Sequence, residues 1–291
     1  MRGRMRLSSH VVFVDYGADV EVQHTVRGTT VRVSRKTYEE LLRFRAFAEY
    51  EPHLDPWVEA GVLVAPFKDT PEAHGGLLPG TEAWLGNVFQ EWYWRHEVEA
   101  EREYRWLGHV AVKMPMDLFF YQELLTGSGT KAVLEVGYGM GGGLWFFATM
   151  LAMGGGGQVI GVDWEPFNES LPPFDRLAHV KVDLVHGDAH AAATLETVRA
   201  LVPDGFGLVV LDADSRPEGK LMLLERWSSL VRPGGYLVLE DVDSPACREA
   251  PELISHGLDR FLLERRDFSL ALEATRFPLL KSHGAVFRRT E

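Results

Sequence analysis

The amino-acid sequence predicts an α/β protein built on a doubly wound, largely parallel sheet, with a small α+β region in front of it. Three observations support this fold class. A glycine-rich turn joins an apolar strand-like run to an apolar helix-like run at residues 131–152. Strand-like and helix-like segments then alternate through the second half of the chain. The strand-like runs are short and almost continuously apolar, as in a parallel sheet that helices cover on both faces.

The central motif is the glycine-rich turn at residues 137–143, between a predicted strand at 132–136 and a predicted helix at 144–152. Glycine allows a positive φ and a close approach of the backbone to a ligand. The free N–H groups at the start of the helix can then bind polar groups of that ligand. Strand, turn and helix together indicate a nucleotide-binding unit. The same glycines also fit the frame of an NAD-type dehydrogenase, so the turn alone leaves the ligand open.

Acidic residues stand at the ends of all five predicted strands. The four later strands are expected at residues 158–163, 180–185, 207–214 and 236–241. The acidic residues at the strand ends are Glu135, Asp163, Asp188, Asp212, Glu240 and Asp241. In doubly wound sheets ligands bind at the carboxyl ends of the strands, so we expect these side chains to line one site. Asp163 is placed to accept hydrogen bonds from ribose hydroxyls, and Asp188 to bind an adenine amino group.

This pattern resembles the class I S-adenosylmethionine-dependent methyltransferases. The motifs that carry the resemblance are residues 135–139, 161–163, 187–189, 211–214 and 232–235. The resemblance implies the Rossmann-like, doubly wound, seven-stranded sheet of that class, with S-adenosyl-L-methionine as the cofactor. The residues that it implies for cofactor binding are Glu135, Gly137, Tyr138, Gly139, Gly143, Asp163, Trp164, Asp188, Ala189 and Asp212.

Within this class, the chain is most similar to the metal-dependent O-methyltransferases of natural-product pathways, including the macrolide and sugar O-methyltransferases and the family labelled cephalosporin hydroxylases. These enzymes place one metal-binding Asp after the fourth strand and a Glu-Asp pair after the fifth. Asp212, Glu240 and Asp241 match that arrangement. Three carboxylates suit a hard cation such as Mg²⁺ and would repel one another without one. The resemblance implies that the ion holds the acceptor oxygens and acidifies the attacking hydroxyl.

The general base of these relatives has no obvious counterpart. Where they have a Lys or His three residues after the first metal-binding Asp, this chain has Ser215, a poor base at neutral pH. His190, His186 and Lys220 are alternative bases, although Lys220 is also expected as an ordinary solvated helix residue. The metal could instead acidify the hydroxyl unaided, or the acceptor could be a carboxylate. We take Asp212, His190 and Asp214 as the candidate catalytic residues, with Asp214 assisting the metal or capping the next helix.

The amino-terminal region predicts a separate small unit. Strands are expected at 10–17, 19–26, 29–34 and 62–65, with helices at 35–47 and 56–60. This order is weakly similar to a PqqD-like peptide-binding module, although a cap or dimerisation module specific to this family fits as well. We expect an auxiliary domain at 1–66, a linker and helical cap at 67–114 and a methyltransferase domain at 115–291. The cap includes a helix predicted over 81–105.

The methyltransferase region has further expected elements. Helices are predicted at 115–125, 221–231 and 252–264, the second of them closed by 232–235. An antiparallel pair of strands at 268–272 and 284–288 would finish the sheet, and residues 274–283 between them would loop near the pocket.

Composition excludes several classes of protein. The 291 residues carry a net charge of −12, which argues against a nucleic-acid-binding protein. Apolar runs reach neither the length of a membrane span nor that of a signal peptide. The single cysteine, Cys247, forms no internal disulfide and no metal motif, which fits a reducing cytoplasm. We expect a cytoplasmic homo-oligomer, at least a dimer.

The preferred interpretation is an S-adenosylmethionine-dependent, Mg²⁺-assisted O-methyltransferase that acts on a secondary metabolite with a vicinal diol or catechol. One alternative is a peptide-modifying methyltransferase whose amino-terminal module binds a leader peptide. Another is a non-catalytic, methyltransferase-like partner subunit. An NAD-type oxidoreductase is disfavoured because a trio of acids beside the substrate has no evident role in hydride transfer.

Overall fold

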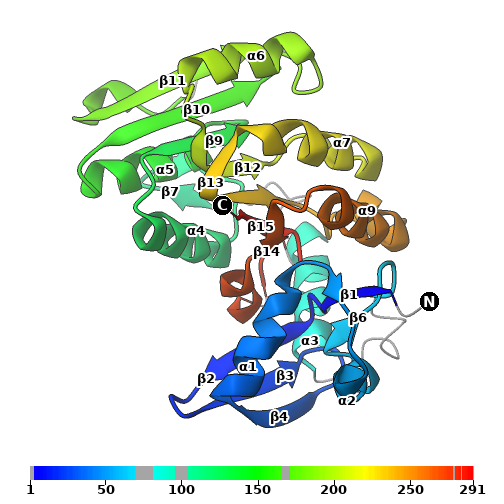
Figure 1. The fold of residues 1–291 in the computed structure, drawn as a ribbon. Helices are drawn as coiled ribbons and strands as arrows, with labels where there is room; N and C mark the ends of the chain where they lie inside the picture. The colour runs from blue at the N-terminus through cyan, green and yellow to red at the C-terminus, as the bar shows by residue number, and fades with distance from the viewer. Residues whose placement is uncertain are drawn as a thin grey trace.

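The computed structural model describes residues 3–69, 81–95, 104–164, 171–277, 279–282 and 284–290. An α/β part formed by the second half of the chain packs on a smaller part formed by residues 3–69 (Figure 1). In Figure 1 the smaller part, coloured blue, lies below the α/β part, and helix α3 (Glu82–Tyr93) lies close to both parts.

The α/β part is organised on a seven-stranded sheet with the order β11-β10-β9-β12-β13-β15-β14. Its strands are β9 (Ala132–Val136), β10 (Gly157–Asp163), β11 (Val180–His186), β12 (Phe206–Leu211), β13 (Val231–Leu239), β14 (Phe268–Leu270) and β15 (Val286–Arg289). The strands β9 to β13 pair in parallel, whereas β15 runs antiparallel to both β13 and β14. The predicted fold class and the predicted closing antiparallel pair are therefore confirmed.

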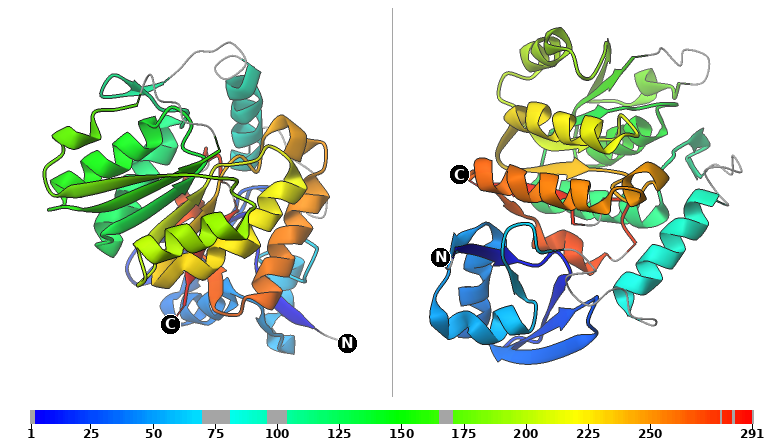
Figure 2. Two further views of the ribbon diagram at one scale, coloured as in Figure 1. Left: turned by 90° about the horizontal axis from the view of Figure 1, so that it is seen from above. Right: turned by 90° about the vertical axis from the view of Figure 1, so that its right-hand side faces the viewer.

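Helices cover both faces of this sheet, as Figure 2 shows from above. On one face lie α4 (Pro115–Ser128) and α5 (Gly142–Met153), whose Tyr121 and Phe147 belong to one apolar core. On the other face lie α6 (Ala192–Leu201), α7 (Pro217–Trp227) and α9 (Pro251–Glu264), which bury Trp227 and Phe261 in a second core. Burying each such side chain stabilises the fold by roughly 1.5–3 kcal/mol, which explains why the strands are apolar on both faces.

The amino-terminal part has its own apolar core around Val20, Leu41 and Phe44. Its strands form two three-stranded sheets, β2-β3-β4 and β5-β1-β6. The strands are β1 (Arg4–Leu7), β2 (Val11–Asp15), β3 (Asp19–His24), β4 (Thr29–Ser34), β5 (Ala48–Glu49) and β6 (Leu63–Val64), with helices α1 (Arg35–Leu42) and α2 (Asp55–Glu59). The predicted order of three strands, two helices and a further strand is therefore present in this region. As predicted, Ser34 is the N-cap of α1, and its side chain accepts a hydrogen bond from Thr37 N.

Three predicted boundaries in the chain are wrong. Helix α1 ends at Leu42, and the chain continues as a 3-10 turn (Arg43–Arg45) because Ala48 must reach Met5 to pair β5 with β1. Helix α7 begins at Pro217, a residue suited to the first helical turn. Residues 232–235, predicted as a turn after that helix, belong to β13, where Gly234 has a φ of 74° beside a register shift in the pairing with β12.

The helix predicted over residues 81–105 is present from Glu82 to Tyr93 as α3, with Thr81 as its N-cap. Residues 96–103 lie outside the described residues. The chain then forms a hairpin, β7 (Arg105–Trp106) and β8 (His109–Val110), so the predicted helix does not extend to residue 105. None of the helices in the described ranges is long and apolar enough to cross a membrane.

A buried ion-pair network joins the two parts of the molecule. The guanidinium of Arg6 in β1 lies 2.8 Å from Asp69 and 2.5 Å from Asp259 in α9, and all three side chains are buried. Asp259 also accepts a hydrogen bond from Phe67 N at 2.5 Å. Breaking such a buried pair costs about 3–5 kcal/mol, so this network holds the amino-terminal part firmly against α9.

Candidate functional site

The glycine-rich turn after β9 brings three strand ends close together. Gly137 has a φ of 93°, and its N–H donates to Val162 O at 2.7 Å. A Cβ at this position would lie 2.5 Å from Asp212 O, closer than any side chain tolerates. Only glycine therefore lets the end of β9 approach the end of β12 so closely.

Glu135, near the end of β9, lies directly beneath the start of α5. Its side chain is buried, and a Cβ at Gly143 would lie 2.4 Å from Glu135 Oε1. Glu135 Oε1 lies 2.9 Å from Lys113 Nζ, whereas Oε2 is buried with no hydrogen-bond partner among the described residues. Burial raises the pKa of Glu135. One carboxylate oxygen beside the turn is thus available to a ligand.

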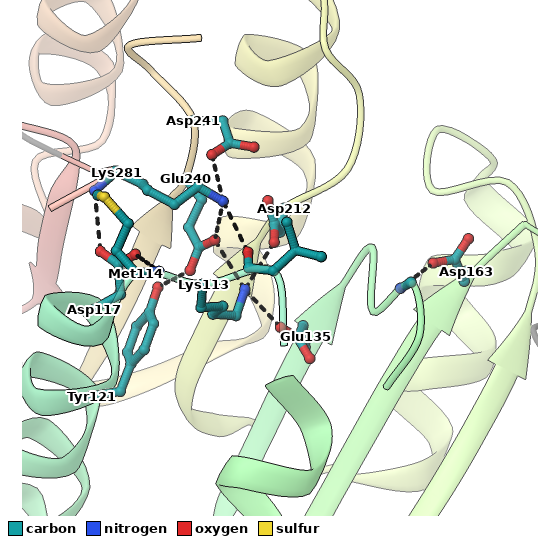
Figure 3. A network of polar contacts seen from close by, with 12 residues as sticks. Lys113, Met114, Asp117, Tyr121, Glu135, Asp163, Asp212, Glu240, Asp241 and Lys281 are labelled. Atoms are coloured by element: carbon teal, nitrogen blue, oxygen red, sulfur yellow. Dashed lines mark hydrogen bonds and ion pairs between the residues drawn. The ribbon is translucent and has the colours of Figure 1, made fainter. Parts of the chain in front are cut away.

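The predicted cofactor residues of the next two strands lie along the same edge of the sheet. Asp163 at the end of β10 accepts hydrogen bonds from Gly139 N at 2.9 Å and Trp164 N at 2.8 Å. Figure 3 shows Asp163 apart from the other labelled carboxylates, on the side of the sheet edge that carries the glycine turn. Asp188, after β11, accepts from His190 N at 2.8 Å. These carboxylates fix the loops that surround the turn.

The remaining predicted cofactor positions differ in exposure. Tyr138 is buried and packs so closely on Gly161 that a Cβ there would lie 2.8 Å from its ring. Trp164 is 74% exposed, free to cover a ligand at this edge. Ala189 O accepts a hydrogen bond from Trp227 Nε1 at 3.1 Å.

Asp212, Glu240 and Asp241 come together after strands β12 and β13. Each offers one carboxylate oxygen, and these oxygens all lie within 4.8 Å of one another. Glu240 is fully buried, whereas Asp212 and Asp241 are partly exposed. Asp241 has a φ of 56°, in the left-handed region that Asp adopts more readily than most other residues. The structure thus gathers the three acids that the sequence predicted as metal ligands.

Two buried lysines that the sequence analysis did not select lie among these acids (Figure 3). Lys113 Nζ lies 2.9 Å from Glu135, 2.8 Å from Asp212 and 2.9 Å from Glu240. Lys113 therefore links the carboxylate beneath the glycine turn to two of the clustered acids. Lys113 follows β8 by three residues, and no periodicity in the sequence marks it.

Lys281 approaches the same cluster from the loop before β15. Its Nζ lies 2.7 Å from Asp241 Oδ1 and 3.7 Å from Glu240 Oε2, and it donates to Val112 O at 3.2 Å. The ammonium also lies 5.9 Å from the centre of the Trp94 ring at the end of α3. The predicted loop at 274–283 therefore reaches the site, through a lysine.

Burial and charge set the protonation of this cluster in opposite directions. Burial would lower the pKa of Lys113, but its three carboxylate neighbours hold that pKa well above its usual value. Burial raises the pKa of Glu240 well above its usual range, and the charge of Asp212 adds to the shift. Burial also opposes ionisation of Asp212, yet Lys113 and Lys281 lower its pKa. Both ammonium groups are therefore charged beside an ionised Asp212.

Helix α4 completes the cluster from below. Tyr121 donates a short hydrogen bond to Glu240 Oε1. Asp117 accepts from Met114 N at 3.0 Å and from Lys281 N at 3.1 Å, and burial raises its pKa to about 6. The segment from Lys113 to Tyr121 thus positions both Glu240 and Lys281.

The predicted candidates for a general base differ in their surroundings. His190 Nε2 lies 3.0 Å from Asp214 Oδ2, and Asp214 also binds the Arg216 guanidinium at 2.7 Å, which lowers the pKa of Asp214. Ser215 and His186 are exposed. The expectation that Lys220 is solvated is wrong: it is 1% exposed and donates to Glu240 O at 3.1 Å, because α7 packs against the end of β13.

The seven-stranded sheet order, the glycine turn over a buried glutamate and the carboxylates at every strand end together define a class I S-adenosylmethionine-dependent methyltransferase. The model of the family "Rhamnosyl O-methyltransferase/CmcI" matches residues 99–253, more than half of the chain. The chain belongs to this family.

Two kinds of relative support this assignment. The rhamnosyl O-methyltransferase of Mycobacterium leprae (strain TN) is 28% identical over 160 residues, which cover 54% of this chain and 67% of that protein. A solved structure of CmcI with Mg and SAM is similar with a TM-score of 0.52 and 25% identity, over 65% of this chain and 77% of that one. The CmcI apo-structure matches with a TM-score of 0.52, 24% identity, and coverage of 65% and 76%, which supports the fold alone.

Proposed function

We propose that this methyltransferase transfers the methyl group of S-adenosylmethionine to an oxygen of a small secondary metabolite, with Mg²⁺ at the acceptor site. The observation that carries the proposal is the convergence of Asp212, Glu240 and Asp241 next to the glycine turn and Glu135. The rhamnosyl and CmcI relatives support an O-methyl transfer and, for CmcI, a site with Mg and SAM. The comparisons give no support to the peptide-modifying or non-catalytic alternatives.

The residues of the glycine turn fit the cofactor. Oε2 of Glu135, which has no hydrogen-bond partner among the described residues, is placed to accept from the ammonium of the methionine part, and the glycines with positive φ let the backbone approach it. Asp163 would bind the ribose hydroxyls. Asp188 and Ala189 would bind the adenine, and Trp164 would cover the adenosine end of the cofactor. The carboxylates that already fix the turn need no large rearrangement to accept these groups.

The acid trio fits a hard divalent cation. Mg²⁺ prefers oxygen ligands, and the trio offers one carboxylate oxygen from each residue. Asp212 is ionised, and a cation bound beside Glu240 would lower the raised pKa of that carboxyl group and favour its ionised form as a ligand. When bound, the ion would hold acceptor oxygens and lower the pKa of the attacking hydroxyl.

The chain itself would orient the groups around the reaction. Lys113 forms ion pairs with Asp212 and Glu240 of the proposed metal site and with Glu135 of the proposed cofactor site. These ion pairs would keep the bound acceptor close to the bound cofactor. Tyr121 and Lys220 fix Glu240 from two directions. His190, held by Asp214, stands at the rim of the site as the proposed proton acceptor or as a cofactor contact.

Calorimetric titration tests this proposal in three steps. S-adenosylmethionine should bind the wild-type chain, and Asp163→Ala should weaken that binding by tenfold or more. Mg²⁺ should bind the wild type and be lost in Asp241→Asn, which leaves the cofactor affinity unchanged. NAD serves as the negative control. Absence of S-adenosylmethionine binding would reject the function, and undiminished Mg²⁺ binding in the Asp241 variant would reject the metal site.

We also propose the domain division expected from the sequence, with an auxiliary unit at 1–66, a connecting region at 67–114 and the methyltransferase unit at 115–291. The separate core of the amino-terminal part supports the first boundary. A cytoplasmic homo-oligomer remains a prediction, which light scattering of the purified chain and localisation of a tagged chain would test.

A further inference from the structure

A cavity of about 650 Å³ lies where the amino-terminal part, α3 and the helices after β13 meet. Its walls come from β1 and the residues that follow it, from the second half of α3, and from α8 (Pro245–Arg248) and α9. In the right-hand view of Figure 2, α9 (orange) and α3 (cyan) lie beside the amino-terminal part (blue). The volume is within the range of small-molecule sites, which are commonly found between domains.

The cavity adjoins the acid trio. Val242 and Asp243, which line it, directly follow Asp241 in the chain. Trp94, also in its lining, lies 5.9 Å from Lys281 Nζ, and that ammonium lies 2.7 Å from Asp241 Oδ1. One ammonium group thus contacts both the cavity wall and the proposed acceptor-binding acids. This end of the cavity therefore lies next to the acid trio, although none of the three acids is in the lining.

The floor of the cavity is apolar. It consists of side chains that are buried in the sheet-side core, namely Val242, Ile254, Leu258, Leu262 and Leu270. Such a surface favours a ligand with an apolar, aromatic or aliphatic body, because transfer of apolar area out of water is worth about 25 cal/mol per Å².

The charged groups of the lining are mostly paired. Arg6 is neutralised by Asp69 and Asp259, and Arg95 lies 2.8 Å from Glu91. Arg248 has no carboxylate among its hydrogen-bond and ion-pair partners within the described part of the chain. Its Nη2 donates to Asn87 O at 3.4 Å, and its buried Nε has no partner there. Arg248 is only partly buried, so its guanidinium is open to the cavity that it lines and can bind an anionic ligand group.

We propose that this cavity is the acceptor site, and that it takes an acceptor with an apolar body and an organic anionic group, such as a carboxylate, bound by Arg248. The proposal rests on the proposed function for its link to methyl transfer. It assigns substrate recognition to the amino-terminal part and α3, because both line the cavity.

Two fluorescent probes of matched shape test the cavity without knowledge of the natural acceptor. 1-Anilinonaphthalene-8-sulfonate carries an anion, and N-phenyl-1-naphthylamine is its uncharged counterpart. Both should bind the wild-type chain. Arg248→Met should weaken the sulfonate about tenfold and leave the uncharged probe within twofold. Arg260→Met, which replaces an exposed arginine of the neighbouring helix α9, should change neither.

A cavity-filling variant locates the probes. Ile254→Trp should abolish binding of both, provided that the melting temperature and the affinity for S-adenosylmethionine stay near the wild-type values. Equal weakening of both probes by Arg248→Met, no weakening of the sulfonate, or probe binding that survives Ile254→Trp would overturn the proposal. The probes could bind as expected to a chain that fails to bind S-adenosylmethionine. That result would support the cavity as a binding site and reject the methyltransferase function, so the two failures are distinguishable.

Discussion

Replacing Lys113 by Met should destabilise the apoprotein by about 3–5 kcal/mol. Methionine keeps the unbranched shape of the side chain, so the loss of packing is small. The charge loss is large, because Lys113 Nζ lies within 2.9 Å of three carboxylates and is 2% exposed. Removing one partner of a buried ion pair leaves uncompensated charge and costs about 3–5 kcal/mol. That is a large part of the roughly 5–15 kcal/mol available to a folded domain.

Lys220→Met provides a matched control. Lys220 is equally buried, but its Nζ donates one hydrogen bond to a backbone oxygen, Glu240 O, at 3.1 Å. Its removal should cost only about 1.5–3 kcal/mol. Urea unfolding of both variants and the wild type in chelator-treated buffer measures the difference. If Lys113→Met costs no more stability than Lys220→Met, the ammonium does not neutralise the cluster as argued.

Magnesium should rescue the Lys113 variant in part. A ligand at one hundred times its Kd stabilises the folded state by about 2.7 kcal/mol. The variant has a higher negative charge density at the acid trio, so Mg²⁺ should bind and stabilise it more than the wild type. Repeating the urea series over a range of Mg²⁺ concentrations tests this. A smaller effect of Mg²⁺ on the variant than on the wild type would contradict the proposed ligand set.

Two further predictions concern single positions. Gly143→Ala should lower the free energy of unfolding by about 1–3 kcal/mol and the cofactor affinity at least tenfold, because the new Cβ would lie 2.4 Å from Glu135 Oε1. As a control, Gly127→Ala in helix α4, where the Cβ would enter open space, should raise the free energy of unfolding by roughly 0.5–1 kcal/mol. The hydrogen bond from the Arg265 guanidinium lowers the pKa of Asp267 in the folded protein. The pair therefore stabilises the fold at pH values above about 3.9, the pKa of an unfolded Asp, and this stabilisation is lost as the pH falls through the lower pKa of the folded state. Asp267→Asn should therefore cost about 0.5–1 kcal/mol at pH 7, with the gap closing below about pH 4 in thermal unfolding; a gap independent of pH would refute the assignment.

The sheet and most of the predicted site residues were predictable because their signals are local. Continuous apolar runs predicted β9 to β13, and the acidic residue at each strand end followed from the rule that such sheets bind ligands there. The glycine turn was visible because its backbone needs positive φ at Gly137, Gly139 and Gly141. These features need no knowledge of distant contacts.

The lysines of the site were not predictable in the same way. A buried lysine is uncommon, and Lys113 and Lys281 are stable inside only because acids from other strands surround them. Those partners lie up to 127 residues away in the chain. Strand β1 was missed for a similar reason: its arginines suggest a solvated terminus, yet Arg6 is buried by Asp69 and Asp259. Tertiary pairing decided each case.

The buried Arg6 network has a consequence for synthesis of the chain. Its two ends, Arg6 and Asp259, are 253 residues apart. At a translation rate of about 5–20 residues per second, roughly 13–50 s separate the appearance of Arg6 from that of Asp259. During this interval the amino-terminal part exists on the ribosome with its arginine in water and its docking face uncovered. Docking of the amino-terminal part against α9 is therefore a late step in folding, and it brings together two walls of the proposed acceptor cavity.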